Sequence, residues 1–268
     1  MLFAAAGVSL GAAYLYAADA PVSYILVNVA ALLVGVVAAR FVAQAQNQRY
    51  AGTFTIAVAL VLLATALVGP RVDGAARWIR IAGLSLQPSL MLLPLAQMFF
   101  TRKQDWLSSI GLTIMAVALA LQPDRAMAGT LVAGLAVLRL YRRNALVTMN
   151  VIVATCGFAS TLLRDDAVPP VPFVEQVVQS AFAYSVLAGL AIMAAFGSML
   201  VPAFIGITTR TEDQAASAVF GAIWLAVIAF AIIGNYPTPP AGYGASGIVG
   251  YCLSAALLRK ESPAAVDS

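Results

Sequence analysis

Residues 72–89 read VDGAARWIRIAGLSLQPS, a polar and aromatic stretch between two hydrophobic segments. Arg77, Ile81 and Leu84 follow helical spacing, which predicts a short helix in a membrane interface, with Trp78 as an anchor at the level of the lipid headgroups. Arginine binds phosphate through two parallel hydrogen bonds, so Arg77 and Arg80 are candidates for contact with an anionic headgroup. An interfacial loop pinned by ordinary phospholipids is the alternative.

The composition of the whole chain indicates which solvent surrounds the protein. Of the 268 residues, 62% are hydrophobic and 10% are charged, and the mean hydropathy is +0.93. A soluble domain of this size would expose large apolar surfaces. The apolar runs are too long for the strands of a membrane barrel, so the sequence predicts an all-α, polytopic membrane helical bundle.

The apolar segments predict about ten transmembrane helices in a single integral membrane domain, residues 1–268. Several segments are shorter than the ~20 residues that a perpendicular helix needs. The two least regular, 88–100 and 246–258, each follow a stretch rich in proline or glycine. The ten segments are 2–18, 22–39, 53–69, 88–100, 107–121, 126–140, 144–162, 178–205, 215–234 and 246–258.

The loops between these segments differ in charge from one side to the other. One alternate set holds ten basic and five acidic residues, and the other holds five basic and six acidic residues. Because basic loops stay in the cytoplasm, this bias predicts a multi-pass protein with both termini cytoplasmic. The basic net charge then reflects membrane topology, and no nucleic-acid partner is expected.

The sequence lacks histidine, and Cys156 and Cys252 both lie inside apolar segments. The commonest general base and metal ligand is therefore missing, and we expect no disulfide, no metal site and no cofactor. Any chemistry must come from carboxylates, arginines, tyrosines or the backbone.

Two further outer segments interrupt the apolar pattern. In Gln122-Pro123-Asp124-Arg125, proline ends one helix and Asp124 is placed to cap the next, while Arg125 is another candidate for a headgroup. Residues 235–246, NYPTPPAGYGAS, are too rich in proline and glycine for regular helix. Irregular backbone at membrane depth is stable only inside protein or beside a wet cavity, so this stretch is either a re-entrant wall or a plain outer loop.

The three segments together resemble the SEDS family (shape, elongation, division and sporulation), which includes the FtsW, RodA and SpoVE types. The family patterns N-G-A-x-R-W-I and Q-P-S-E resemble residues 73–79 and 87–90, read here as DGAARWI and QPSL. Its Q-P-D matches residues 122–124, and its P-F-x-S-Y-G-G-S resembles residues 239–246. The positions that we take as the structural motif are Gly74, Pro88, Ser89, Pro123, Asp124, Tyr243, Gly244 and Ser246.

This resemblance implies a ten-helix protein of the bacterial inner (cytoplasmic) membrane that polymerises peptidoglycan from lipid II in cell division or cell-shape maintenance. It also implies contacts with membrane lipids, with a polyprenyl-linked precursor, and with a membrane protein complex that includes a class B penicillin-binding protein. The candidate residues for binding a lipid headgroup are Arg77, Trp78, Arg80, Gln87 and Arg125.

The sequence departs from the family where the chemistry is expected. Leu90 stands at the position of the glutamate that follows Q-P-S, and Leu93 stands at the position of a lysine three residues later. An apolar side chain there carries no charge and makes no hydrogen bond, so the family's ion pair cannot form.

The fourth outer loop, residues 163–179, lacks the family's glycine-rich stretch and its L-P-E-x-H-x-D-F-I motif, whose aspartate is regarded as catalytic. Aligning Val168-Pro169 with L-P puts Val174 at the aspartate position and Glu175 one residue later. Glu175 is then a candidate for a displaced catalytic base, with Asp165 and Asp166 as alternatives. Carboxylates near a helix start are also favoured by the helix macrodipole, which offers a structural explanation for all three.

Two functions remain after these departures. We expect a non-catalytic structural or accessory subunit of a membrane complex, a pseudoenzyme that keeps the SEDS fold; the alternative is an active peptidoglycan glycosyltransferase. Dense small residues in segments 2–18 and 178–205 allow close helix packing, either with a partner or within the bundle. Transport of a lipid-linked precursor is less favoured, because the spans are nearly free of ionisable groups.

Overall fold

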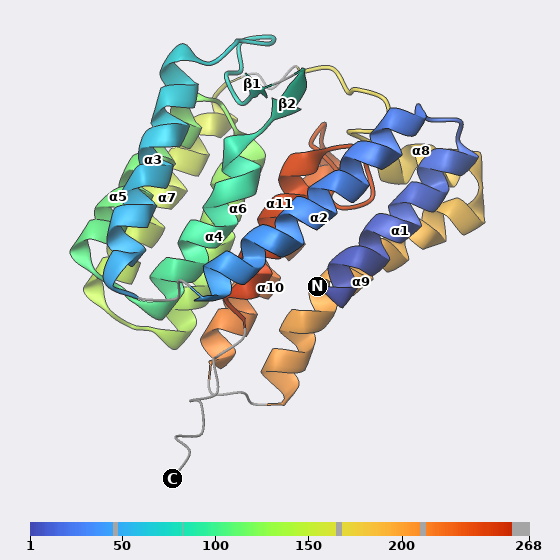
Figure 1. Ribbon diagram of the computed structural model, residues 1–268. Helices are drawn as coiled ribbons and strands as arrows, with labels where there is room; N and C mark the ends of the chain where they lie inside the picture. The colour runs from blue at the N-terminus through green and yellow to red at the C-terminus, as the bar shows by residue number, and fades with distance from the viewer. Residues whose placement is uncertain (45–47, 82, 165–167, 210–212, 259–268) are drawn as a thin grey trace.

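The computed structural model describes residues 1–44, 48–81, 83–164, 168–209 and 213–258, which form eleven α-helices, a short 3-10 helix and a two-stranded sheet (Figure 1). The long helices run up and down through one bundle, and the two strands lie at one end of it. The helices are α1 Leu2–Ala17, α2 Val22–Gln44, α3 Ala51–Val68, α4 Pro88–Arg102, α5 Trp106–Leu121, α6 Arg125–Tyr141, α7 Ala145–Leu162, α8 Val177–Tyr184, α9 Val186–Thr208, α10 Gln214–Ile233 and α11 Ala245–Ala256.

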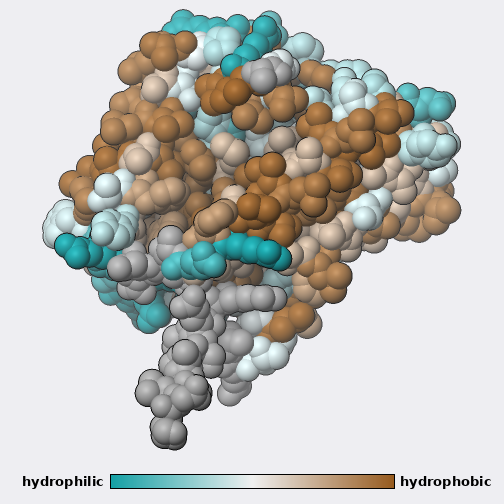
Figure 2. All heavy atoms as spheres, viewed as in Figure 1, coloured by the Kyte–Doolittle hydropathy of each residue, from teal (hydrophilic) through white to brown (hydrophobic). Residues whose placement is uncertain are grey.

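Apolar side chains cover the sides of the bundle. Figure 2 shows hydrophobic residues over the middle of this face and hydrophilic residues gathered toward its two ends, as expected of a protein surrounded by hydrocarbon. Within the described part of the chain, five helices are long and apolar enough to cross a membrane, namely α2, α3, α7, α9 and α10. The prediction of an all-α, polytopic membrane bundle is confirmed.

The helices follow the apolar segments of the sequence, with one break. Segment 178–205 holds two helices, α8 and α9, because Ser185 between them has an extended backbone (φ −165°, ψ 154°). The hydroxyl of Ser185 accepts a hydrogen bond from the Ala188 N–H at 3.1 Å and so caps α9. The eight residues of α8 rise only about 12 Å, too little to cross a bilayer.

The predicted interfacial helix near Trp78 is wrong. Strands β1 (Ile79–Ile81) and β2 (Leu84–Leu86) form an antiparallel hairpin in which Ile79 lies opposite Leu86. Each strand alternates an apolar, a polar and an apolar residue, which fits the two-residue period of a strand. Gly83, at φ +82°, supplies a backbone conformation at the turn that L side chains rarely adopt.

The first turn of helix α4 makes a close contact with α11. Pro94 lies inside α4 and has no N–H to donate to the Leu90 carbonyl. A methyl group on Gly250 of α11 would lie 2.4 Å from that carbonyl oxygen, so only glycine permits the observed approach. Leu90 and Leu93 are both buried.

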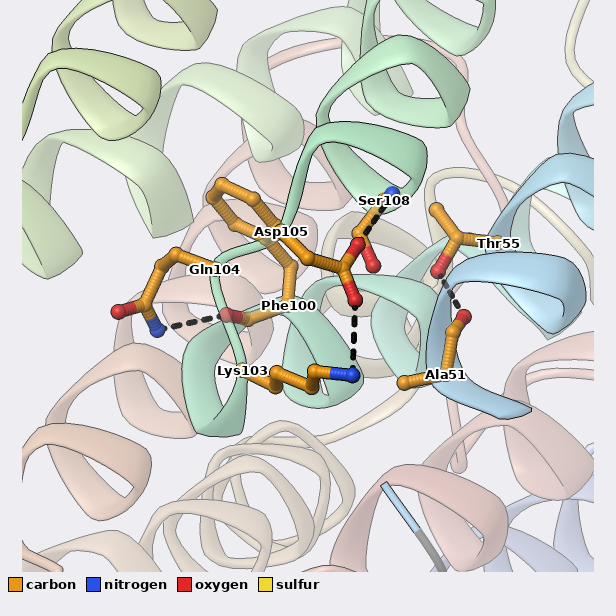
Figure 3. A network of polar contacts seen from close by, with 7 residues as sticks. All are labelled: Ala51, Thr55, Phe100, Lys103, Gln104, Asp105 and Ser108. Carbon is orange, nitrogen blue, oxygen red and sulfur yellow. Dashed lines mark hydrogen bonds and ion pairs between the residues drawn. The ribbon is translucent and has the colours of Figure 1, made fainter. Parts of the chain in front are cut away.

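At the opposite end of the bundle, side chains cap the helices that begin there. Asp105 in the α4–α5 turn is one of them (Figure 3). Asp105 accepts a hydrogen bond from the Ser108 N–H at 2.8 Å and pairs with Lys103 at 3.2 Å. Burial acts to raise the pKa of Asp105, but the bonds from Ser108 and the contact with Lys103 outweigh burial and hold that pKa below its ordinary value. Both interactions fix the start of α5.

Candidate functional site

A cavity of about 340 Å³ lies at the hairpin end of the bundle, and we call it the outer cavity. Its walls come from residues 70–90, from residues 168–175, from residues 237–247 and from Val27 of α2. The first of these contains the Q-P-S stretch, the second is part of the fourth outer loop, and the third contains most of the proline-rich segment. Segments that are far apart in the sequence therefore share one site.

The wall of the outer cavity is mostly apolar. Leu90, in place of the family's glutamate, is part of it. Its charged groups, among the described residues that line it, are those of Arg80 and Glu175, and its aromatic side chains are Trp78 and Tyr243. An apolar pocket with a few polar groups is typical of a small-molecule site.

A buried carboxylate joins the Q-P-S and Q-P-D motifs behind this wall. Gln87 Nε2 and Ser89 Oγ donate hydrogen bonds to Asp124 Oδ2 at 2.9 and 2.8 Å, and Asp124 Oδ1 accepts one from the Met127 N–H at 3.2 Å. The predicted cap of the helix after Pro123 is confirmed. The same side chain also fixes the start of α4, a link between two helices that motif spacing does not reveal.

The part of the cavity wall formed by residues 237–247 is hydrogen-bonded to α2 and to the residue before α4. The Gln87 N–H donates to Ser246 Oγ at 2.8 Å. Asn28 of α2 donates to the Gly242 carbonyl at 2.9 Å and accepts from the Gly244 N–H at 3.1 Å. The backbone of residues 235–244 is irregular and most of these residues are buried, as their proline and glycine content predicts, and re-entry into the membrane stays a prediction.

Asn28 and its neighbour Tyr24 were missed by the sequence analysis. The ring of Tyr24 stacks on Tyr243 with centroids 3.9 Å apart, one helical turn from the Asn28 contacts. The available signal was an amide inside an otherwise apolar segment, since a polar side chain in a membrane helix needs a partner.

Arg77 lies inside the protein, where its guanidinium donates to the Pro123 carbonyl. It also lies over the rings of Trp78 and Tyr236, 6.0 and 5.6 Å from their centroids. It is not part of the cavity wall. Its interactions hold the 72–78 loop against the Q-P-D turn.

The other candidate headgroup residues divide into two sets. Arg125 donates to the Arg164 carbonyl at 3.0 Å and lies outside the cavity wall. Trp78, Arg80 and Gln87 all line the cavity. The loop that precedes Arg77 turns at Asp73 and Gly74, both at positive φ, which explains the glycine of the first motif.

Glu175 is the candidate catalytic carboxylate that the structure places in the cavity wall. Its side chain is buried and accepts a hydrogen bond from the Val171 N–H at 2.7 Å. Burial raises the pKa of Glu175 to about 7, against that hydrogen bond and the positive charge of Arg77. The two alternatives, Asp165 and Asp166, lie outside the described residues.

The small residues of α1 and α9 are used in part within the bundle. A methyl group on Gly7 would lie 2.5 Å from the Pro240 ring, and one on Gly11 would lie 2.5 Å from the backbone of Ala241. Gly189 meets the ring of Phe182 in the same way. These glycines permit close packing within the bundle. This was one of the two explanations that the sequence offered for the small residues, the other being packing against a partner.

Fold and site together define a polytopic helical membrane protein whose loops at the hairpin end enclose a cavity. Residues 6–164 match the model of a family described as cell cycle proteins, FtsW/RodA/SpoVE. The chain belongs to this family, as the resemblance in its motifs predicted.

Solved structures of similar fold cover almost all of the chain. The rod shape determining protein RodA of Thermus thermophilus shares 18% identity with a TM-score of 0.66, over 96% of this chain and 93% of that one. A second similar chain belongs to a structure described as the structural coordination of polymerization and crosslinking by a peptidoglycan synthase complex; it shares 20% identity with a TM-score of 0.63, over 96% and 94% of the two chains. A search of curated proteins returned no match.

Proposed function

We propose that this protein is a non-catalytic SEDS subunit of a membrane complex, which binds a lipid in its outer cavity and does not polymerise glycan. The observation that carries the proposal is Leu90, an apolar residue in the cavity wall where the family has glutamate. Polymerisation requires charged groups around the reacting sugars, and the wall offers few of them. Residues 1–268 would form one integral membrane domain of the bacterial inner membrane.

Several residues have proposed roles in this function. Trp78, Arg80 and Gln87 line the cavity and are placed to contact the bound lipid. Arg77 and Arg125 donate to backbone carbonyls, so we assign them to the support of the walls. The same support role falls to Asp124 through its bonds to Gln87 and Ser89.

The partner proposed for this subunit is a membrane protein complex of cell-wall synthesis, with a class B penicillin-binding protein as its expected member. The similar chain from a peptidoglycan synthase complex supports this assignment. Purification from native membranes in mild detergent should recover the protein with a stoichiometric membrane partner. Recovery as a lone monomer would count against the subunit role.

An active glycosyltransferase is the second candidate, favoured by Glu175. A buried carboxyl group in the cavity wall, with a pKa of about 7, is suited to accept a proton from a sugar hydroxyl. This candidate needs Glu175 to act one residue from the position that the family uses.

One assay separates the two candidates. Purified protein is incubated with lipid II, with and without the co-purified partner, next to an active SEDS polymerase as positive control. We expect no glycan polymer. If polymer forms, Glu175→Gln should abolish it, while Asp105→Asn at the other end of the bundle should leave it unchanged.

A further inference from the structure

The charge of the outer cavity does not suit a pyrophosphate. Among the described lining residues, Arg80 supplies the positive charge and Glu175 supplies a carboxyl group that is ionised above about pH 7. The two charges cancel, whereas a pyrophosphate is bound best by several cations acting together. A carboxylate beside a bound pyrophosphate would also repel it.

Two further cations of this end, Arg77 and Arg125, are used elsewhere, while Arg71 and Arg164 are exposed and do not line the cavity. The guanidinium of Arg77 donates to the Pro123 carbonyl inside the protein, and that of Arg125 donates to the Arg164 carbonyl. Neither residue lines the cavity. Turning either side chain toward the cavity would leave a backbone carbonyl without its donor, which is costly where that carbonyl is buried.

The rest of the wall suits a neutral ligand. Leu84, Leu86 and Leu90 offer apolar surface, and the indole of Trp78 and the ring of Tyr243 offer flat faces. Glu175 offers a carboxyl oxygen that a hydroxyl group can donate to. Carboxylates accept hydrogen bonds from hydroxyl groups without any need for opposite charge.

We infer that the outer cavity takes a neutral hydroxyl group carried on an apolar chain, and that it discriminates against a pyrophosphate on the same chain. The inference rests on the proposed function, since it names the lipid class that a non-polymerising subunit would hold. A prenyl alcohol and a lipid-linked sugar share this chemistry.

Two probes with one hydrocarbon chain test the discrimination, because farnesol and farnesyl pyrophosphate differ only in the headgroup. Trp78 lines the cavity and reports binding through its fluorescence. The protein is reconstituted in phosphatidylcholine nanodiscs at pH 8 and titrated with each probe, and octyl glucoside is added as a third probe to separate a sugar from an alcohol. The Trp78→Phe variant, which keeps Trp106 and Trp224, supplies the background signal for each titration.

We expect farnesol or octyl glucoside to half-saturate the Trp78 signal at a concentration at least tenfold below that of farnesyl pyrophosphate. Glu175→Gln should tighten the binding of farnesyl pyrophosphate several-fold and weaken that of farnesol, because the amide oxygen still accepts from the hydroxyl but carries no charge. Asp105→Asn should change neither. Equal or tighter binding of the pyrophosphate would overturn the inference, and so would the absence of any signal that depends on Trp78. Preferred binding of the pyrophosphate would overturn this inference and leave the proposed subunit standing, whereas the absence of any signal would also count against lipid binding in the cavity. Polymerisation of lipid II, or the lack of a membrane partner, would instead overturn the proposed subunit.

Discussion

At the scale of one residue, the burial of Glu175 makes the stability of the folded protein depend on pH. Its pKa is about 7 in the folded protein against 4.5 for an ordinary glutamate, because burial disfavours the carboxylate. Between these two values the folded state binds more protons than the unfolded state, so stability falls as the pH rises through this window and levels off above about 7. The carboxylate form is therefore the less stable one.

Glu175→Gln should remove this pH dependence. The amide oxygen can still accept from the Val171 N–H, and no charge remains to be desolvated. At pH 8 the variant should be more stable than the natural protein by up to about 3 kcal/mol, and at pH 4 the two should be equal. Thermal unfolding midpoints in detergent across this pH range check the result, and parallel curves for the two proteins would contradict it.

Asp124 and Asp105 are both helix caps, and their substitution should have unequal costs. Asp124→Ala leaves the buried donors of Gln87 and Ser89 without their acceptor, so we expect a loss of about 3 kcal/mol of stability. Asp105→Ala removes a half-buried cap and should cost about 1 kcal/mol. Chemical unfolding in mixed micelles measures both, and equal losses would show that the link between the two motifs contributes nothing.

Residue patterns predicted the Asp124 cap but not the position of Arg77. A cap is a local feature, since its acceptor and donor are three residues apart. The partner of the Arg77 guanidinium is the Pro123 carbonyl, 46 residues away along the chain, and no local spacing encodes that contact. Glu175 was reached by alignment with a motif, whereas its burial and its hydrogen bond became visible only in the fold.

At the scale of the elements, α4 and α11 depend on one glycine. Gly250→Ala would place a methyl group 2.4 Å from the Leu90 carbonyl, where backbone has to move. We expect the free energy of unfolding to fall by about 2 kcal/mol, as is typical of overpacked cores. Because Leu90 lines the outer cavity, the Trp78 fluorescence should change as well.

Gly197 of α9 is the matched control for Gly250. Nothing lies within 4 Å of a methyl group added there, and alanine favours helix over glycine by roughly 0.5 to 1 kcal/mol. Gly197→Ala should therefore leave the unfolding midpoint unchanged or raise it. A drop comparable to that of Gly250→Ala would mean that the loss follows from the substitution type and not from the contact.

The hairpin shows why one element was predicted wrongly. Arg77, Ile81 and Leu84 fit a helical period, and the same short stretch also fits a strand period through Ile79, Ile81, Leu84 and Leu86. Short apolar patterns are ambiguous between the two. The positive φ of Gly83 produces the turn of a hairpin in place of a continuous helix. The sequence shows that a glycine is present but not which φ it adopts.

At the scale of the whole molecule, the apolar segments predicted nearly every helix because membrane helices must be long and continuous. The exception, the division between α8 and α9, depends on a single capping serine inside an apolar run. With α8 too short to cross, the ten other described helices remain as the predicted crossings, and an even number would place both termini on the same side of the membrane. The start of α1 and the end of α11 lie away from the hairpin in Figure 1.

This arrangement predicts that the hairpin faces the outside and that the α6–α7 turn faces the cytoplasm. Strand β2 and the α6–α7 turn lie at opposite ends of the bundle in Figure 1. Ser85 of β2 and Arg143 of that turn are both exposed. In a background with both natural cysteines replaced by serine, a membrane-impermeant maleimide should label Ser85→Cys in intact spheroplasts and Arg143→Cys only after permeabilisation. The basic residues around Arg143 oppose its translocation, since loops rich in arginine stay in the cytoplasm. The reverse labelling pattern would place both termini outside and would turn the outer cavity toward the cytoplasm.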